Sequence, residues 1–252
     1  MWRRRYNTRA WIGAALIAGI AAGSAATAGA EDQTLSRKRD VLAWERLNNA
    51  FSKAFIAKQH DEALRRAQDS LQTAERVFGP DDPAVAVSLG QLAAALEATG
   101  DYSRLEGLLQ RALAIRTAAL GPNHPDTAKS LTNLGRFRHF HHQYAEAEAL
   151  YKRALAVHES VQGPDRNDFA IANALHDLAV AYRDQEQYSK ALECVKRELD
   201  IWDGKFGTDY PLALPIIDMY VEMARRTGDA RKAESLDARA QRIRAARESG
   251  QE

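Results

Sequence analysis

The sequence contains a single cysteine, Cys194, so no disulfide can form within the chain and no site with several cysteine ligands can hold a metal. Cys194 stands in the stretch KALECVKREL, whose pattern predicts a helix. The expected role of this thiol is therefore that of a small, unreactive packing residue.

Proline and glycine are also scarce, with 7 and 15 among 252 residues, and no stretch alternates Val, Ile and Thr with a period of two. Without such runs, β-strands are not expected. Alanine, leucine, arginine and glutamate, which favour helices, dominate instead. A composition of 45% hydrophobic and 27% charged residues is that of an ordinary globular protein. The sequence therefore predicts an all-α fold.

Charge is missing from Ala10 to Ala30, directly after the basic start MWRRRYNTR. A basic start, an apolar stretch and small residues before a polar segment are the three regions of a secretory signal peptide. Cleavage is expected after Ala28 or Ala30, which leaves residues 31–39 as a linker. The alternative is an uncleaved anchor, because 21 uncharged residues could span a bilayer. The strongly apolar part is short, which favours cleavage.

Loss of residues 1–30 removes four arginines and leaves 31 basic against 34 acidic residues. No basic excess then remains to indicate nucleic acid as a partner. An exported protein without disulfides fits a bacterial envelope better than a eukaryotic extracellular space. We therefore expect a periplasmic or secreted protein, with no membrane contact unless the N-terminal segment stays uncleaved.

The rest of the chain is repetitive. Four glycines recur at intervals of 42, 42 and 44 residues, and three tyrosines recur at intervals of 42 and 44. Repeats of this length are typical of solenoids, in which neighbouring units share one elongated core. The glycines are Gly79, Gly121, Gly163 and Gly207, and the tyrosines are Tyr102, Tyr144 and Tyr188.

Within each repeat, apolar residues follow two helical stripes separated by a short turn. A glycine ends the second helix, and a nearby proline prevents its continuation. Asp82, or Asp126 with Thr127, is expected to supply capping groups and first-turn acids to the helix that follows. Five helix pairs are predicted, with a tail at 248–252; they cover about residues 37–78, 83–120, 125–162, 167–206 and 210–247.

This pattern resembles the tetratricopeptide repeat (TPR) family, and its spacing resembles the kinesin-light-chain subtype. The resemblance covers about residues 40–247 and implies a right-handed α-solenoid of about five antiparallel helix pairs, a TPR superhelix. The matching residues of the central repeat are Leu131, Leu134, Gly135, Ala147, Tyr151 and Ala154.

The resemblance also implies a binding surface, because the first helix of each TPR pair lines a concave groove that binds peptides. One groove-facing offset holds an amide or acid in four repeats, and such groups can hydrogen-bond the backbone of an extended peptide. Alternatively, this offset is only the exposed polar side of an amphipathic helix. The four residues are Asn49, Gln91, Asn133 and Asp177, with Lys129, Arg136 and Asn173 expected nearby.

The sequence contains no phosphate-binding loop, nucleophile elbow or zinc-protease motif. We therefore expect a non-enzymatic adaptor or scaffold without a cofactor, which binds a protein or peptide partner in the groove. The alternative is a structural module that self-associates or docks on an envelope complex. A weaker third hypothesis is metal binding by His139 and His142, although histidines at a helix end are ordinarily solvated.

Overall fold

The computed structural model describes residues 24–249. By its internal contacts the chain divides into two parts, Met1–Glu45 and Arg46–Glu252. The signal-peptide prediction falls mainly on residues 1–23, which lie outside the described residues.

The first described element is helix α2, Ser24–Ile56, which spans the boundary between the two parts. Residues 31–39, expected as a linker, are helical because they lie within α2. The last turns of α2 belong to the second part, where Phe51 and Ala54 are buried against residues of α3 and α4.

The helices that follow are separated by short turns, and two of these turns contain a 3-10 helix. The elements are α3 (His60–Phe78), α4 (Pro83–Thr99), α5 (Leu105–Leu120), α6 (Pro125–Phe140), α7 (Tyr144–Ser160), η1 (Gly163–Asp165), α8 (Asp168–Asp184), α9 (Tyr188–Phe206), η2 (Pro211–Ala213), α10 (Leu214–Arg226) and α11 (Ala230–Glu248).

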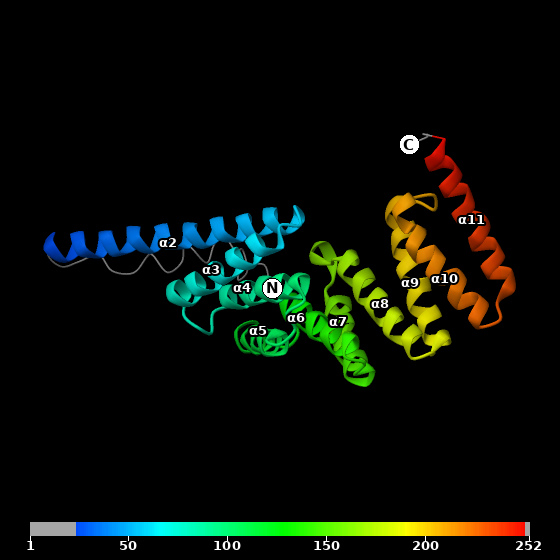
Figure 1. Ribbon diagram of the computed structural model, residues 1–252, viewed down its shortest axis with the longest axis horizontal. Coiled ribbons are helices and arrows are strands. Elements are labelled where there is room, and N and C mark those ends of the chain that lie inside the picture. The colour runs from blue at the N-terminus through cyan, green and yellow to red at the C-terminus, as the bar shows by residue number, and fades with distance from the viewer. Residues whose placement is uncertain (1–23, 250–252) are drawn as a thin grey trace. The chain divides into compact units, whose positions relative to one another are not determined.

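Within Arg46–Glu252, each helix packs mainly on the helices next to it in the chain, as expected for a solenoid. Consecutive helices run antiparallel and form the stacked pairs of a TPR-like superhelix (Figure 1). The all-α fold predicted from the sequence is thereby confirmed. The first helices of the pairs here are α4, α6, α8 and α10, and the second helices are α5, α7, α9 and α11.

The Gly-Pro turns end one helix and start the next. Gly79 and Gly121 follow α3 and α5 with φ angles of 91° and 92°, which a residue with a side chain rarely adopts. Pro83 and Pro125 then occupy the first position of α4 and α6, where the missing N–H costs no helical hydrogen bond.

The residues that cap these helices are only partly those expected. Asp82 accepts a hydrogen bond from the backbone N–H of Ala84 at 2.8 Å, as predicted for α4. For α6, however, the cap is His124, whose Nδ1 accepts from the N–H of Asp126 at 3.1 Å. Asp126 lies in the first turn of α6, as predicted for a first-turn acid, but neither Asp126 nor Thr127 is the N-cap, and that part of the prediction is wrong.

The repeat motif also explains the closest packing between α6 and α7. Gly135 is buried on α6, and a Cβ atom at this position would lie 2.6 Å from Cε1 of Tyr151. No side chain fits at that separation, so Gly135 allows the Tyr151 ring to lie directly against the α6 backbone. Ala147, on the same helix as Tyr151, is fully buried.

The last helix, α11, buries one face and leaves the other in water. Ala233, Leu236, Ala240 and Ile243 pack into the core formed with α7 to α10. This is the arrangement expected for a helix that caps a solenoid. No helix among the described residues is both long and apolar enough to cross a membrane.

Candidate functional site

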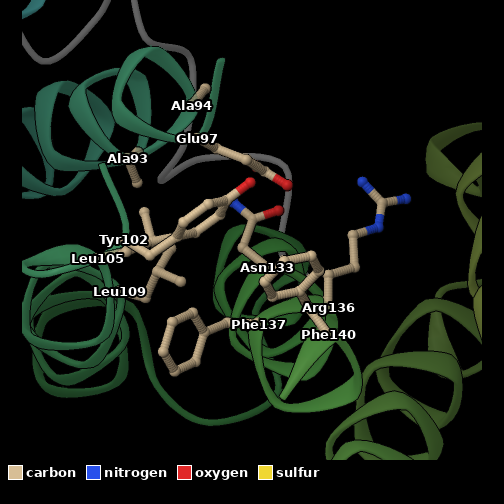
Figure 2. Close-up of a pocket in the computed structure, with 11 residues that line it drawn as sticks. Ala93, Ala94, Glu97, Tyr102, Leu105, Leu109, Asn133, Arg136, Phe137 and Phe140 are labelled. Atoms are coloured by element: carbon tan, nitrogen blue, oxygen red, sulfur yellow. The ribbon is translucent and has the colours of Figure 1, made fainter. Parts of the chain in front are cut away.

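The first helices α4 and α6, together with α5, enclose a pocket of about 160 Å³ (Figure 2). Most of its lining residues are apolar, although polar atoms form the larger share of the surface that faces the pocket. The lining includes three aromatic rings and three side chains that carry polar or charged groups besides the tyrosine hydroxyl. The lining residues are Gly90, Ala93, Ala94, Glu97, Tyr102, Leu105, Leu109, Asn133, Arg136, Phe137 and Phe140.

An aromatic pair forms one side of the pocket. Tyr102, in the turn before α5, stacks on Phe140, the last residue of α6, with ring centroids 4.9 Å apart and planes at 17°. Phe140 is 58% exposed, whereas Phe137 one turn earlier is buried. The pocket therefore presents a partly exposed aromatic surface to a binding partner, which is a common feature of binding sites.

Asn133 and Arg136 are the two predicted site residues that line this pocket. Asn133 is partly exposed, and its amide is available as both donor and acceptor. Arg136 directs its guanidinium toward α8, where Nε and Nη2 donate to the two carboxylate oxygens of Asp177, each at 3.0 Å (Figure 2).

The carboxylate of Asp177 is therefore already bound within the chain. Its side chain is only 11% exposed, against 56% for that of Arg136. Burial by itself would lower the pKa of Arg136, but the hydrogen bonds and charge of Asp177 outweigh burial and raise that pKa. The geometry is bidentate, which makes this a strong kind of ion pair.

A second polar side-chain contact connects the same two helices. Nε2 of His139, on α6, lies 2.9 Å from a carboxylate oxygen of Asp184, on α8. The bidentate pair of Arg136 and Asp177 joins the same two helices. The Asp177 carboxylate of the predicted ladder therefore already has a partner within the chain.

The remaining predicted residues lie away from the pocket. Asn49 and Asn173 are exposed on α2 and α8. Lys129 is 65% exposed and binds Asp126 through its Nζ at 2.8 Å. Gln91 is partly buried, and its Oε1 has no hydrogen-bond partner in the described structure.

The histidines at the end of α6 have partners within the chain. His139 binds Asp184, and Nδ1 of His142 lies 2.7 Å from the hydroxyl of Tyr144. Across residues 24–249, no group of three His, Cys, Asp or Glu side chains is placed to hold a metal ion. Burial raises the pKa of Cys194 to about 11, which keeps this thiol protonated and unreactive.

The repeat pattern in the sequence did not single out the aromatic and acidic members of the pocket. The spacing of Asn133, Phe137 and Phe140, at positions i, i+4 and i+7, is a signal that could have placed them on one face of α6. Tyr102 was recognised only as a marker of the repeat. Glu97 had no such signal, because its approach to the pocket depends on how α4 packs beside α6.

The fold and its repeat pattern define a helical repeat protein with a pocket between α4, α5 and α6. The sequence profile described as Tetratricopeptide repeat matches residues 42–104, 105–166 and 170–246. The chain therefore belongs to the tetratricopeptide repeat family, whose members are generally scaffolds for protein–protein interaction and are typically not enzymes.

Solved structures with the same fold include kinesin-light-chain proteins. The TPR-like repeats described as those of a kinesin light chain from Podosopora anserina share 21% identity, with a TM-score of 0.66, over 80% of this chain and 96% of that one. BtubC (BKLC) from P. vanneervenii shares 20% identity, with a TM-score of 0.70, over 86% and 92%.

A third structure of this fold is MamA 41-end from Desulfovibrio magneticus RS-1, at 20% identity and a TM-score of 0.56. The matched region covers 81% of this chain and 96% of the MamA chain. No curated protein sequence matches this chain. At these sequence identities, the similarity to the solved structures shows a shared fold only.

Proposed function

We propose that this protein is an exported, non-enzymatic scaffold that binds a peptide segment of a protein partner in the groove of its first helices. The observation that carries this proposal is the pocket between α4, α5 and α6, where apolar side chains meet the amide of Asn133. An apolar pocket with a few polar groups is the usual form of a binding site. The groove also agrees with the general role of the family.

The pocket gives each part of a bound segment a separate role. The amide of Asn133 can donate to and accept from the peptide backbone, which fixes the direction of the segment. The exposed ring of Phe140 and its neighbour Tyr102 can cover one side chain of the peptide, which supplies most of the binding energy. Asp177 holds Arg136 in place beside them and does not itself contact the peptide.

The test is a binding measurement on a partner isolated with the purified protein. We expect Asn133→Ala combined with Phe140→Ala to weaken binding at least about tenfold, because each removes a contact worth about 1 kcal/mol or more. Lys129→Ala, outside the pocket, serves as the control and should leave the affinity unchanged. Equal affinity of the double variant and the native protein in calorimetry would rule out this pocket as the binding site.

Export is the second part of the proposal and rests on the charge pattern of residues 1–30. The protein made in a bacterial host should then begin at residue 29 or 31, after cleavage behind Ala28 or Ala30. Intact-mass measurement of the protein from the periplasmic fraction tests this expectation. A full-length chain, or recovery only with the membrane, would favour the uncleaved anchor.

A specific observation also supports the alternative of self-assembly. Phe169 and Phe206 are each 43% exposed and their rings lie 5.8 Å apart, while Leu212 nearby in the chain is 64% exposed. Exposed apolar groups of this kind are common at contacts between proteins. Light scattering of the purified chain distinguishes the two functions, since a strict monomer at all concentrations argues against self-assembly.

A further inference from the structure

We propose that the pocket between α4, α5 and α6 receives a lysine or arginine side chain of the bound segment. This inference rests on the proposed function, because it names the chemistry of the peptide that the groove binds. Three observations support it: the charge of the lining, the aromatic wall, and the use of an equivalent tyrosine elsewhere in the chain.

The charges at the pocket favour a cation. Glu97 lines the pocket and is exposed, and it forms no ion pair within the described residues. Arg136 is the only cationic side chain in the lining, and both of its bonded nitrogens face Asp177. Figure 2 shows its guanidinium directed away from the aromatic rings. Glu97 also contributes to the raised pKa of Arg136, but this guanidinium is bonded to Asp177, so the two carboxylates and the one guanidinium together carry a net charge of −1.

An acidic peptide side chain fits poorly for the same reason. It would need the guanidinium of Arg136, and would have to draw this group away from Asp177. The carboxylate of Asp177, at 11% exposure, would then remain largely buried without its cation. Loss of one partner of such a pair costs more than the pair itself contributes.

The aromatic wall suits the stem and the head of a long basic side chain. Leu105, Leu109 and Phe137 are buried behind the pocket and can cover an aliphatic stem. The stacked rings of Tyr102 and Phe140 present π-electron density to a cation. The hydroxyl of Tyr102 and the Oδ1 of Asn133 are hydrogen-bond acceptors for an ammonium or guanidinium group.

The chain itself provides an internal example. Tyr188 is the repeat equivalent of Tyr102, and the guanidinium carbon of Arg226, the last residue of α10, lies 5.2 Å from its ring centroid. In the pocket, the equivalent place at the end of α6 is taken by Phe140 instead. A tyrosine at this repeat position therefore accommodates a cation in one repeat, and the pocket has no basic side chain of its own at that place.

The test is selection of a random peptide library on the purified full chain, on three pocket variants and on one control variant. Gly90→Trp blocks the pocket, because an added Cβ at Gly90 meets nothing within 4 Å and the larger side chain can occupy the space. Glu97→Gln removes the charge, and Glu97→Lys reverses it. Glu222→Gln, an exposed acid on the first helix α10 outside the pocket, is the matched control.

We expect the peptides selected on the native chain, and lost on Gly90→Trp, to be enriched in lysine or arginine. Their affinity should fall by about three- to tenfold in Glu97→Gln, fall further in Glu97→Lys, and stay unchanged in Glu222→Gln. It should also fall as salt concentration rises, since the contact is partly exposed.

Two other results overturn the inference and are distinct from one another. Pocket-dependent peptides without an excess of basic residues, or with equal affinity for Glu97→Gln, would refute the cation site and leave the proposed function standing. If no selected peptide is sensitive to Gly90→Trp, the pocket does not bind peptides, and the proposed function fails together with the inference.

Discussion

Gly135 and Tyr151 show how a single atom decides packing at the scale of residues. We predict that Gly135→Ala lowers the free energy of unfolding by about 1–3 kcal/mol, because the new methyl group overlaps the Tyr151 ring. Gly90→Ala is the control, since it adds the same group to helix α4 in open space. It should raise the free energy of unfolding by up to about 1 kcal/mol through helix propensity. Urea denaturation measures both, and a stabilised Gly135→Ala would contradict the packing argument.

His176 and Glu198 predict a dependence of stability on pH. Nδ1 of His176 lies 3.1 Å from the carboxylate of Glu198, which is almost fully buried. The hydrogen bond to Glu198 chiefly raises the pKa of His176, against the opposing effect of burial. Because the folded pKa is the higher one, this contribution is complete below the unfolded pKa of about 6.5 and is lost as pH rises through the folded pKa.

The difference in stability between the native chain and His176→Gln isolates this contribution. Other histidines act in the opposite direction: burial lowers the pKa of His158, whose contribution is lost as the pH falls. We expect His176→Gln to destabilise the chain more at about pH 5.5 than at about pH 8.5 in thermal melts. If the difference in stability between the two proteins is constant across this range, Glu198 does not stabilise the protonated form of His176.

At the scale of elements, the caps determine where the first helices begin. Asp82→Ala removes the hydrogen bond to the N–H of Ala84 and should lower the free energy of unfolding by about 1 kcal/mol. Asp81→Ala changes an exposed neighbour that makes no cap and should have little effect. Equal losses in chemical denaturation would indicate a general charge effect instead of a cap.

The connection between α6 and α8 belongs to the same scale and could not be predicted. Arg136 and Asp177 are 41 residues apart, and His139 and Asp184 are 45 residues apart. The repeat pattern places Asp177 and Asn133 at one offset and predicts one role for both. Their roles differ because Asp177 has a guanidinium within reach from the preceding first helix, whereas Asn133 faces the pocket.

At the scale of the whole molecule, the core is divided among neighbouring repeats. Residues of α7 to α11 form one buried cluster, and residues of α2, α3 and α4 form another. We predict that deletion of residues 229–252 increases amide hydrogen exchange in α9 and α10 by about tenfold or more, because α11 no longer covers them. Exchange in α3 and α4 should remain unchanged in mass-spectrometric measurements. A uniform increase along the chain would mean that the solenoid unfolds as one unit.

The sequence by itself determined the helical fold and the boundaries at the Gly-Pro turns. Helical periodicity, capping residues and turn glycines act over a few residues, so a local pattern is enough to recognise them. The repeat pattern also predicted Asn133 and Arg136 as groove residues, and both line the pocket between α4, α5 and α6.

Only the tertiary structure decided which of these residues share a site. The pocket depends on Glu97, Tyr102 and Phe140, which come from different elements and meet because α4, α5 and α6 pack together. The neutralisation of Arg136 by Asp177 likewise depends on the stacking of two repeats. Side-chain contacts between distant residues leave no periodic signal, and the chemistry of the groove is therefore decided by packing.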